Sequence, residues 1–470
     1  MNELCAKRVL IAASGSNSGK TTITCALLEL LKREGLEPLS FKCGPDYIDP
    51  MFHKKVLGIE SRNLDSFFSG SKGVRRILAE YGECYAVIEG VMGIYDGIRT
   101  DSTEGSAYEI AVATSTPVIL VVDASGTGRT VISLIKGILL DDTAGLIKGI
   151  LLNNIREHFY VDLKPVLEKE LAGIRDDVAL LGFFPRDREL SIGSRHLGLK
   201  LPGEIEDIKT KIDASASLLE KCADSKKILS IMEKAERTEA QAEDRLIIPE
   251  VFEEGKRCRL AVAYDEAFCF YYRDNLKLFE KLGAELCYFS PLKDKAVPED
   301  ADGILLGGGY PENYLKELSA NHPMLDSIRN AIGGGMPSLA ECGGFMYLHR
   351  SITAMGGVRY EMAGVVDGEC EYTGKLVRFG YMEIESVADP ELKENELIKS
   401  LEGMRGHEFH YYDSSNNGAA YLAKKPYKDI EWNCIIYRNN GIWGFPHFYY
   451  PSKPEFVIAF IKAMKERAHG

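Results

Sequence analysis

The sequence has little of what membrane proteins and nucleic-acid-binding proteins need. No apolar run reaches the roughly 18–20 residues of a membrane helix, and the first residues, MNELCAKR, contain no apolar signal-peptide core. Lysine and arginine number 57 against 70 aspartates and glutamates, so the formal net charge is −13. This shortage of basic residues argues against non-specific nucleic-acid binding, which needs a basic surface. We therefore expect small molecules as partners, with no nucleic acid and no membrane.

Paired cysteines are also missing. The chain has 11 cysteines, an odd number, and none of them form a C-x-x-C motif. This pattern predicts reduced thiols and a cytoplasmic protein. Most of the cysteines are expected to be small buried side chains, and Cys342 needs a different explanation, given below.

Expected strands and helices alternate along both halves of the chain. With 470 residues the chain is too long for one ordinary core. In the first half, strand-like runs begin at residues 8, 37, 84, 116, 148 and 178, and 20–35 reads as an amphipathic helix. This alternation predicts an α/β fold with a doubly wound parallel sheet. We predict a first domain at 1–235, a charged linker at 236–256, and a second α/β domain at 257–470.

One hexapeptide shows the limit of local patterns. IKGILL occurs at 135–140, within a helical run, and again at 147–152, where it leads into NN and reads as a strand. Tertiary context must decide between the two structures.

A deviant phosphate loop follows the first strand. The standard pattern is G-x-x-x-x-G-K-[ST], yet position 14 here is Ser14 and the glycine stands at 15. A strand, a glycine-containing loop, GKT and a helix still occur in the required order, which favours phosphate binding over a flexible turn. Lys20 would reach the β- and γ-phosphates and Thr21 would bind Mg²⁺. The predicted nucleotide-binding residues are Gly15, Gly19, Lys20, Thr21 and Thr22.

Acidic residues follow two of the expected strands. KCGPDYIDP carries Asp46 and Asp49, and EGVMGIYDG carries Glu89 and Asp96. Mg²⁺ prefers oxygen ligands, and the carboxyl ends of parallel strands meet in one crevice. Taken singly, each residue is equally well read as a solvated loop carboxylate. Taken together, the four favour a metal–nucleotide site.

A second motif, PSLAECGGFMYL, places Cys342 between a short strand and a helix start. A nucleophile on such a turn is expected to be exposed, with its thiol pKa lowered by the helix N-terminus. Its neighbours would form an oxyanion hole, for which the predicted residues are Gly308, Gly309 and Gly343. His447 is the candidate base, with His407 and His410 as rivals. The alternative for Cys342 is a buried structural thiol.

These motifs together resemble those of the cobyrinic acid a,c-diamide synthase family. SGSNSGKTT, KCGPDYIDP, EGVMGIYDG and SRHLGL resemble its ATP-binding synthetase domain, which is related to dethiobiotin synthetase. AVAYDEAFCFYYRDNL, LGGGYPE, AECGGFMYL, RFGYMEI and GHEFHYY resemble its class I glutamine amidotransferase domain. The resemblance runs from end to end of the chain and assigns these two domain types to the two predicted domains.

The resemblance implies an ATP- and glutamine-dependent ligase of cobalamin biosynthesis. Cys342 would attack glutamine with His447 as base, and the ammonia would cross to the first domain. There ATP would phosphorylate the a- and c-acetate carboxylates of cobyrinic acid in turn, and ammonia would displace the phosphate. The implied ATP–Mg²⁺ residues are Lys20, Thr21 and Glu89, with Thr21 and Glu89 on the metal, and the implied substrate residues are Asp46, Tyr47 and Asp96.

The tail departs from the family pattern. Its GFPHFYY keeps the first histidine as His447, but Tyr449 occupies the place where many class I amidotransferases have a glutamate. His447 would then be ordered by another carboxylate or by none. Arg195 and His196 are the candidates for contacting the ring carboxylates, and a surface turn explains them equally well.

Several alternatives stay open at this point. The same chemistry could act on another tetrapyrrole, such as hydrogenobyrinate or nickel-sirohydrochlorin. A nucleotide-switch ATPase with a partner-binding second domain shares the deviant loop but leaves E-C-G-G unexplained. A dead glutaminase domain with a regulatory role conflicts with the presence of Cys342. The order of amidation is not fixed by the sequence, nor is the oligomeric state, for which a homodimer is the candidate.

Overall fold

The structure, a computed structural model, describes residues 7–187, 190, 194–195, 198–199, 208–237, 258–388, 392 and 394–469. The chain forms two compact units, Met1–Leu246 and Ile247–Gly470, and each is described by itself. The predicted linker, 236–256, lies outside the described residues apart from its first two.

The first unit is built on a seven-stranded parallel sheet in the order β3-β2-β4-β1-β5-β6-β7. Its strands are β1 (Lys7–Ala13), β2 (Pro38–Cys43), β3 (Ser61–Leu64), β4 (Tyr85–Glu89), β5 (Val118–Asp123), β6 (Ile147–Asn153) and β7 (Ala179–Phe184). A short antiparallel pair joins β8 (Ser194–Arg195) to β9 (Gly198–Leu199). The parallel sheet confirms the predicted fold class.

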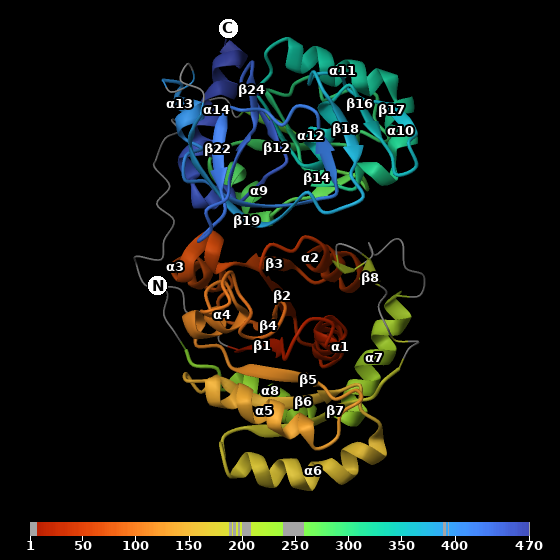
Figure 1. Ribbon diagram of the computed structural model, residues 1–470, viewed down its shortest axis with the longest axis vertical. Helices are drawn as coiled ribbons and strands as arrows, with labels where there is room; N and C mark the ends of the chain where they lie inside the picture. The colour runs from red at the N-terminus through yellow and green to blue at the C-terminus, as the bar shows by residue number, and fades with distance from the viewer. Residues whose placement is uncertain are drawn as a thin grey trace. The chain divides into compact units, whose positions relative to one another are not determined.

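Helices cover both faces of this sheet (Figure 1). They are α1 (Lys20–Arg33), α2 (Ile48–Phe52), a π-helical turn at His53–Leu57, α3 (Ser66–Ala79), α4 (Ala107–Thr114), α5 (Thr130–Asp141), α6 (Glu157–Ala172), α7 (Ile208–Cys222) and α8 (Ser225–Glu233). Helices α3 to α6 contribute to one buried cluster on one face. Helices α1 and α7 contact each other, and α1, α7 and α8 contact strands of the sheet. The sheet is therefore doubly wound.

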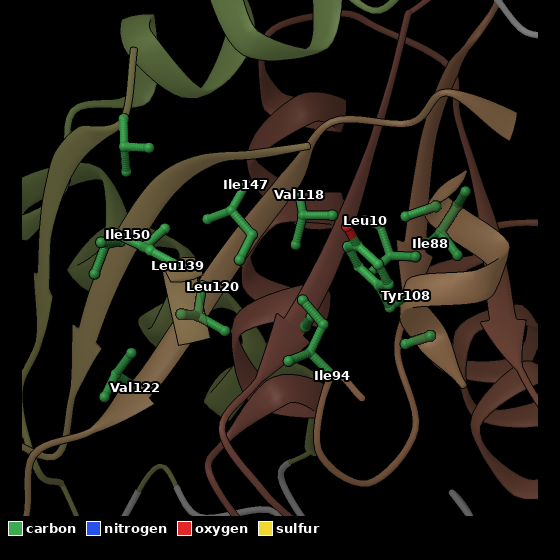
Figure 2. Close-up of a cluster of buried hydrophobic side chains, with 14 of the residues drawn as sticks. Leu10, Ile88, Ile94, Tyr108, Val118, Leu120, Val122, Leu139, Ile147 and Ile150 are labelled. Atoms are coloured by element: carbon green, nitrogen blue, oxygen red, sulfur yellow. The ribbon is translucent and has the colours of Figure 1, made fainter. Parts of the chain in front are cut away.

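The strand sequences account for this burial on both sides. Successive side chains on a strand point to opposite faces, and β1, β4 and β5 are apolar at nearly every position. Leu10, Ile88, Val118, Leu120 and Val122 pack in the cluster shown in Figure 2. The intervening residues of the same strands are also fully buried, against the other helices. Such continuous apolar runs are typical of parallel sheets.

The second unit contains a six-stranded mixed sheet in the order β12-β10-β13-β15-β25-β24, with only the β24–β25 pair antiparallel. Its strands are β10 (Arg259–Ala263), β12 (Glu285–Phe289), β13 (Gly303–Leu306), β15 (Ser338–Glu341), β24 (Ile436–Arg438) and β25 (Gly441–Gly444). The helices of this unit are α9 (Arg273–Lys281), α10 (Leu315–Ala320), α11 (His322–Gly333), α12 (Gly343–Leu348), α13 (Glu396–Lys399) and α14 (Pro454–His469), with 3₁₀ turns at Pro311–Asn313 and Tyr450–Ser452.

Three smaller sheets complete the second unit, and the strand–helix alternation did not predict them. One is five-stranded, in the order β23-β22-β19-β20-β26. Its strands are β19 (Arg378–Val387), β20 (Arg405–His410), β22 (Tyr421–Lys424), β23 (Glu431–Cys434) and β26 (His447–Phe448). The others join β17 (Arg359–Glu361), β16 (Ser351–Thr353), β18 (Glu369–Tyr372) and β21 (Tyr412–Ser414), and β11 (Phe268–Phe270) with β14 (Gly308–Gly309).

Two expectations about composition can be compared with the structure. Within the described ranges, no helix combines the length and apolarity needed to cross a membrane. Among the cysteines that the structure describes, nine are free thiols, of which seven are buried: Cys25, Cys43, Cys258, Cys269, Cys342, Cys370 and Cys434. Cys84 departs from the expectation of reduced thiols because it is disulfide-bonded.

We expect Leu120→Ala to lower the free energy of unfolding of the first unit by about 2–5 kcal/mol, because it leaves a cavity at a fully buried position of β5. Leu140→Ala on α5 is the matched control, since that side chain is 73% exposed, and we expect a change below about 0.5 kcal/mol. Urea unfolding followed by circular dichroism measures both. Equal losses in the two variants would contradict the assignment of Leu120 to the core.

Candidate active sites

The phosphate loop lies where the strand order of the first sheet reverses. β1 pairs with β4 on one side and β5 on the other, so its carboxyl end is the switch point of the sheet. Ligands of open α/β sheets bind in the crevice at such a point. Residues 14–19 connect this strand end to α1, which begins at Lys20.

Gly19 is the glycine that the loop geometry requires. Its φ is 88°, and a Cβ at this position would lie 2.1 Å from Asn153 Nδ2. Asn153, the last residue of β6, donates from that atom to Ser18 O at 2.8 Å. A Cβ on Gly15 would meet no atom within 4 Å. The displaced glycine therefore borders open space, and Asn153, which the sequence analysis did not single out, supports the loop.

Lys20 lies across the loop. Its ammonium donates to Gly15 O at 3.0 Å and to Met92 O at 2.5 Å. Burial, together with the nearby charge of Lys42, lowers the pKa of Lys20 to about 8. An anion in the loop would favour the charged ammonium. Thr22, in the first turn of α1, is half-buried.

Thr21 and Glu89 meet in a buried cluster of charges. Thr21 Oγ1 donates to Glu89 Oε1 at 2.6 Å. Lys42 Nζ donates to the same oxygen at 2.8 Å and lies 2.5 Å from Asp49 Oδ2. Burial raises the pKa of Glu89 to about 7, with Asp49 adding to the shift and Lys42 opposing it. Lys42 was not among the residues predicted from the sequence. It could have been found only from the pairing of β2 with β4, which places it opposite Glu89.

The residues around Glu89 fit a magnesium ion. Glu89 Oε2 is buried and makes no hydrogen bond to any described residue, and the Thr21 hydroxyl is bound to the other oxygen of the same carboxylate. Both are hard oxygen donors of the kind that Mg²⁺ selects. Within the described ranges no group of three or more His, Cys, Asp or Glu side chains could hold a metal.

The remaining predicted residues of the first unit lie in nearby loops. Asp46 Oδ1 accepts from the Ile48 and Asp49 amides at 2.8 and 3.1 Å, and so turns the chain into α2. Burial, then Asp49, raises the pKa of Asp46 to about 6. Tyr47 is buried, whereas Asp96 is exposed and accepts from the Gly93 amide at 2.8 Å.

The structure describes no side-chain contact for the two residues suggested to bind the ring carboxylates of the substrate, Arg195 and His196. Arg195 lies in β8, and its side chain is outside the described structure. His196 lies outside the described residues altogether.

In the second unit Cys342 occupies a strained turn. It follows β15 directly and precedes α12, with φ 46° and ψ −102°. Its amide donates to Gly444 O at 2.8 Å, which ties the turn to the end of β25. Strained backbone of this kind costs on the order of 1–3 kcal/mol and gathers at functional sites. A nucleophile between a strand and a helix is held in such a turn.

Two expectations about Cys342 require correction. The residue is 7% exposed rather than accessible. Burial raises the pKa of its thiol, with Glu312 adding to the shift. A hydrogen bond from the Gly343 amide lowers that pKa, but by less than burial raises it. Helix α12 has only six residues, so its end contributes little charge against this desolvation. The resting thiol is therefore neutral.

His447 and the three predicted oxyanion glycines gather at this turn. Because β25 pairs with β15, the chain reaches His447 three residues beyond the strand next to Cys342. A Cβ on Gly308 would lie 2.3 Å from His447 Cε1, and one on Gly343 would lie 3.2 Å from Gly309 N. Side chains larger than hydrogen are thus excluded where the two glycine loops and the histidine meet.

The rival histidines have other partners. His407 lies opposite His447 in the β20–β26 pair, and the two rings stack with centroids 5.0 Å apart. His407 Nδ1 is 3.1 Å from Tyr272 Oη, and His410 Nε2 is 2.9 Å from Glu408 Oε2. Burial, with His407 and His410 adding to it, lowers the pKa of His447 well below its usual value. His447 is therefore neutral, as a base must be.

The chain matches two described protein families, one in each unit. Residues 9–199 match the CobQ/CobB/MinD/ParA nucleotide binding domain, and residues 259–443 match the CobB/CobQ-like glutamine amidotransferase domain. The first unit is thus a nucleotide-binding domain and the second a glutamine amidotransferase domain. Together they define an enzyme of the glutamine-hydrolysing, ATP-dependent ligase class.

Similarity to curated proteins extends over nearly the whole chain. The cobyrinate a,c-diamide synthase of Caldanaerobacter subterraneus subsp. tengcongensis is 38% identical over 458 residues, covering 96% of this chain and 97% of that protein. The cobyrinate a,c-diamide synthase of Clostridium tetani is 37% identical over 460 residues, covering 97% and 100%. The chain belongs to the cobyrinate a,c-diamide synthase family.

We expect Gly19→Ala to lower the free energy of unfolding of the first unit by about 1–3 kcal/mol, because a Cβ strains a left-handed backbone and meets Asn153. Nucleotide affinity should fall with it. Gly15→Ala is the matched control within the same loop and should leave the stability unchanged. Urea unfolding and calorimetric titration with ATP measure the two effects. If Gly15→Ala destabilised the unit as much as Gly19→Ala, the described loop geometry would be wrong.

Proposed function

We propose that this enzyme amidates the a- and c-acetate carboxylates of cobyrinic acid in turn, in cobalamin biosynthesis, using ATP and glutamine. One observation carries the proposal. A GKT loop at the switch point of one parallel sheet and a cysteine turn beside His447 in another occur in a single chain that aligns with cobyrinate a,c-diamide synthases along 96% of its length. Each half alone fits other functions, whereas their fusion fits a ligase that makes its own ammonia.

The second unit would release ammonia from glutamine. His447 takes the proton of the Cys342 thiol, and the sulfur attacks the side-chain amide carbon. The amides of Gly309 and Gly343 stabilise the oxyanion, while Gly308 leaves room for the imidazole. Collapse of the tetrahedral intermediate, with a proton returned by His447, releases ammonia and leaves a thioester that water hydrolyses. The close approach of Gly309 N to Gly343 supports this assignment.

The first unit would activate the carboxylate. The loop amides and Lys20 hold the phosphates of ATP, and the γ-phosphoryl group moves to a carboxylate oxygen of the substrate, releasing ADP. Ammonia attacks the acyl carbon and inorganic phosphate leaves. Thr21 and Glu89 would hold Mg²⁺, which when bound neutralises phosphate charge. Asp46, Tyr47 and Asp96 would position the substrate, and their loops after β2 and β4 support this role.

The same chemistry on hydrogenobyrinate or nickel-sirohydrochlorin is the nearest alternative. The named relatives favour cobyrinate, since the similar curated proteins of the two organisms carry that name. A nucleotide-switch ATPase would use the first unit alone and would leave the strained Cys342 turn without a purpose.

We expect Cys342→Ser to reduce glutamine-dependent amidation by about 10³-fold or more and to leave ammonia-dependent amidation in place, because only the nitrogen source is lost. Lys20→Ala should remove both activities. Product mass reports the number of amides gained. A Cys342→Ser enzyme that still used glutamine well would contradict the two-site mechanism.

A separate measurement identifies the tetrapyrrole substrate. We expect a panel of tetrapyrrole carboxylates with ATP and ammonium chloride to give a mass change of two amides with cobyrinate, because the proposed reaction stops at the a- and c-acetates. Faster turnover of nickel-sirohydrochlorin, or amidation of further side chains of cobyrinate, would replace this substrate assignment while leaving the ligase chemistry intact.

We expect Gly308→Ala to lower glutaminase activity by about 100-fold, because the added methyl would displace the His447 ring. Gly333→Ala is the control, since a Cβ there meets no atom within 4 Å. Glutamate release measures the loss, and ammonia-dependent amidation should stay at the parent level in both variants. Unchanged glutamate release by Gly308→Ala would remove His447 from the role of base.

A further inference from the structure

The position that holds an acid in many class I amidotransferases has another task in this chain. Tyr449 Oη donates to Asp274 Oδ2 at 2.8 Å, and the Tyr449 ring packs edge-on against Tyr272. Tyr449 is buried and so is Asp274. This residue therefore joins α9 to the segment after β26 and supplies no carboxylate to His447.

A different carboxylate reaches the histidine from the strand that carries the nucleophile. Glu341 is the last residue of β15, directly before Cys342, and its Oε2 lies 4.0 Å from His447 Nδ1. Its other oxygen accepts a 2.6 Å hydrogen bond from Tyr450 Oη. The side chains of Glu341 and His447 are 9% and 3% exposed, so water screens little of the interaction between them.

We propose that Glu341 positions His447 for proton transfer from Cys342, taking the place of the acid that Tyr449 does not provide. The proposal rests on the proposed glutaminase roles of Cys342 and His447. Glu341 is a positioning residue, because it acts through the imidazole and touches no reacting atom.

The geometry suits this role before glutamine binds. A separation of 4.0 Å exceeds a hydrogen bond, yet a small ring rotation or one water closes it, and catalytic hydrogen bonds are often long in ligand-free enzymes. With Nδ1 of His447 directed at Glu341, the proton of the Cys342 thiol passes to Nε2. The Glu341 charge then stabilises the imidazolium, and the same proton later goes to the leaving nitrogen.

The surrounding segment is held rigidly, as a positioning role requires. Asn275 on α9 donates to Phe448 O at 2.7 Å and accepts from the Tyr450 amide at 2.9 Å. The amide of Phe448 also hydrogen-bonds the Glu341 carboxyl group. Both sides of the Glu341–His447 pair are thus fixed by hydrogen bonds to the backbone around His447.

Another buried glutamate of this unit is already engaged. Glu408 on β20 pairs with His410 Nε2 at 2.9 Å and accepts from Trp432 Nε1 at 3.0 Å. It therefore serves as a control, being another buried glutamate of this unit that lies beside a histidine side chain.

Burial predicts a pH signature for Glu341. It raises the pKa of Glu341 to about 8, while hydrogen bonds from Tyr450 and Phe448 oppose the rise. The facing titratable groups are His447, Tyr450, Cys342 and Tyr271. Because only the ionised carboxylate stabilises the imidazolium, glutaminase kcat/KM should rise as pH passes through about 8.

The experiment compares Glu341→Gln, Tyr450→Phe and Glu408→Gln with the parent full-length enzyme, measuring glutamate release from pH 6 to 10. We expect Glu341→Gln to lower glutaminase kcat about tenfold or more with KM for glutamine little changed, and to abolish the rise near pH 8. Tyr450→Phe should move the rise to higher pH, since it removes a hydrogen bond that lowers the pKa of Glu341. Glu408→Gln should keep the rise in place.

Ammonia-dependent amidation separates positioning from folding and should be unchanged in Glu341→Gln and Tyr450→Phe. A parent-like pH profile and kcat in Glu341→Gln would overturn the proposal, as would an equal loss of glutamine- and ammonia-dependent activity. If Glu341→Gln did not fold, an unshifted profile in Tyr450→Phe would overturn it instead. Failure of the glutaminase assignment itself appears separately, as a parent enzyme whose glutamate release survives Cys342→Ser.

Discussion

Backbone hydrogen bonding between parallel neighbours, β1 with β4 and β5 and β15 with β25, sets both candidate sites. Parallel strands end at the same edge of a sheet, so residues far apart in sequence meet there. In the first unit this brings the GKT loop to Glu89 at the end of β4. In the second it brings Cys342 to the chain that leads from β25 to His447. The chemistry in each unit is thus a consequence of strand order.

Burial then decides how each site is charged. Lys42, Glu89 and Asp49 lie together almost without solvent contact, and removing one partner of such a group costs about 3–5 kcal/mol, because an uncompensated charge remains. These ion pairs join the segment after β2, which carries Asp49, to the end of β4, where Glu89 contacts Thr21 of the GKT loop. The pKa of Lys20 is lowered to about 8, and an incoming polyphosphate would favour its charged form.

The local motifs could be predicted from the sequence. The contacts that depend on how strands are paired could not. The GKT loop and the Cys342 turn are contiguous, so their residue order defines them. Lys42 faces Glu89 only through the β2–β4 register, and Asn153 reaches the loop from β6. Glu341 was visible beside Cys342, but its reach toward His447 depends on β15 pairing with β25. None of these partners follows from spacing along the chain.

Tertiary context also explains the repeated hexapeptide and the unpredicted sheets. IKGILL at 135–140 lies in α5, where Leu140 is exposed to solvent. At 147–152 it lies in β6, a largely buried strand that pairs with β5 and β7. Several antiparallel strands of the second unit, such as β17, β23 and β24, are short and partly exposed, so their patterns are weak. They nevertheless deliver His447, because β26 pairs with β20.

Desolvation keeps the resting Cys342 thiol and His447 imidazole neutral. It also strengthens the electrostatic effect of the groups beside them. A thiolate and an imidazolium are both disfavoured in a buried site, so ion-pair formation at Cys342 and His447 needs compensation from fixed groups. The Gly343 amide supplies it on the sulfur side. On the histidine side the nearby carboxylate is Glu341, whose own burial keeps its field from being screened. In the proposed mechanism, the same burial that suppresses charge at rest would strengthen the few groups that stabilise it during the reaction.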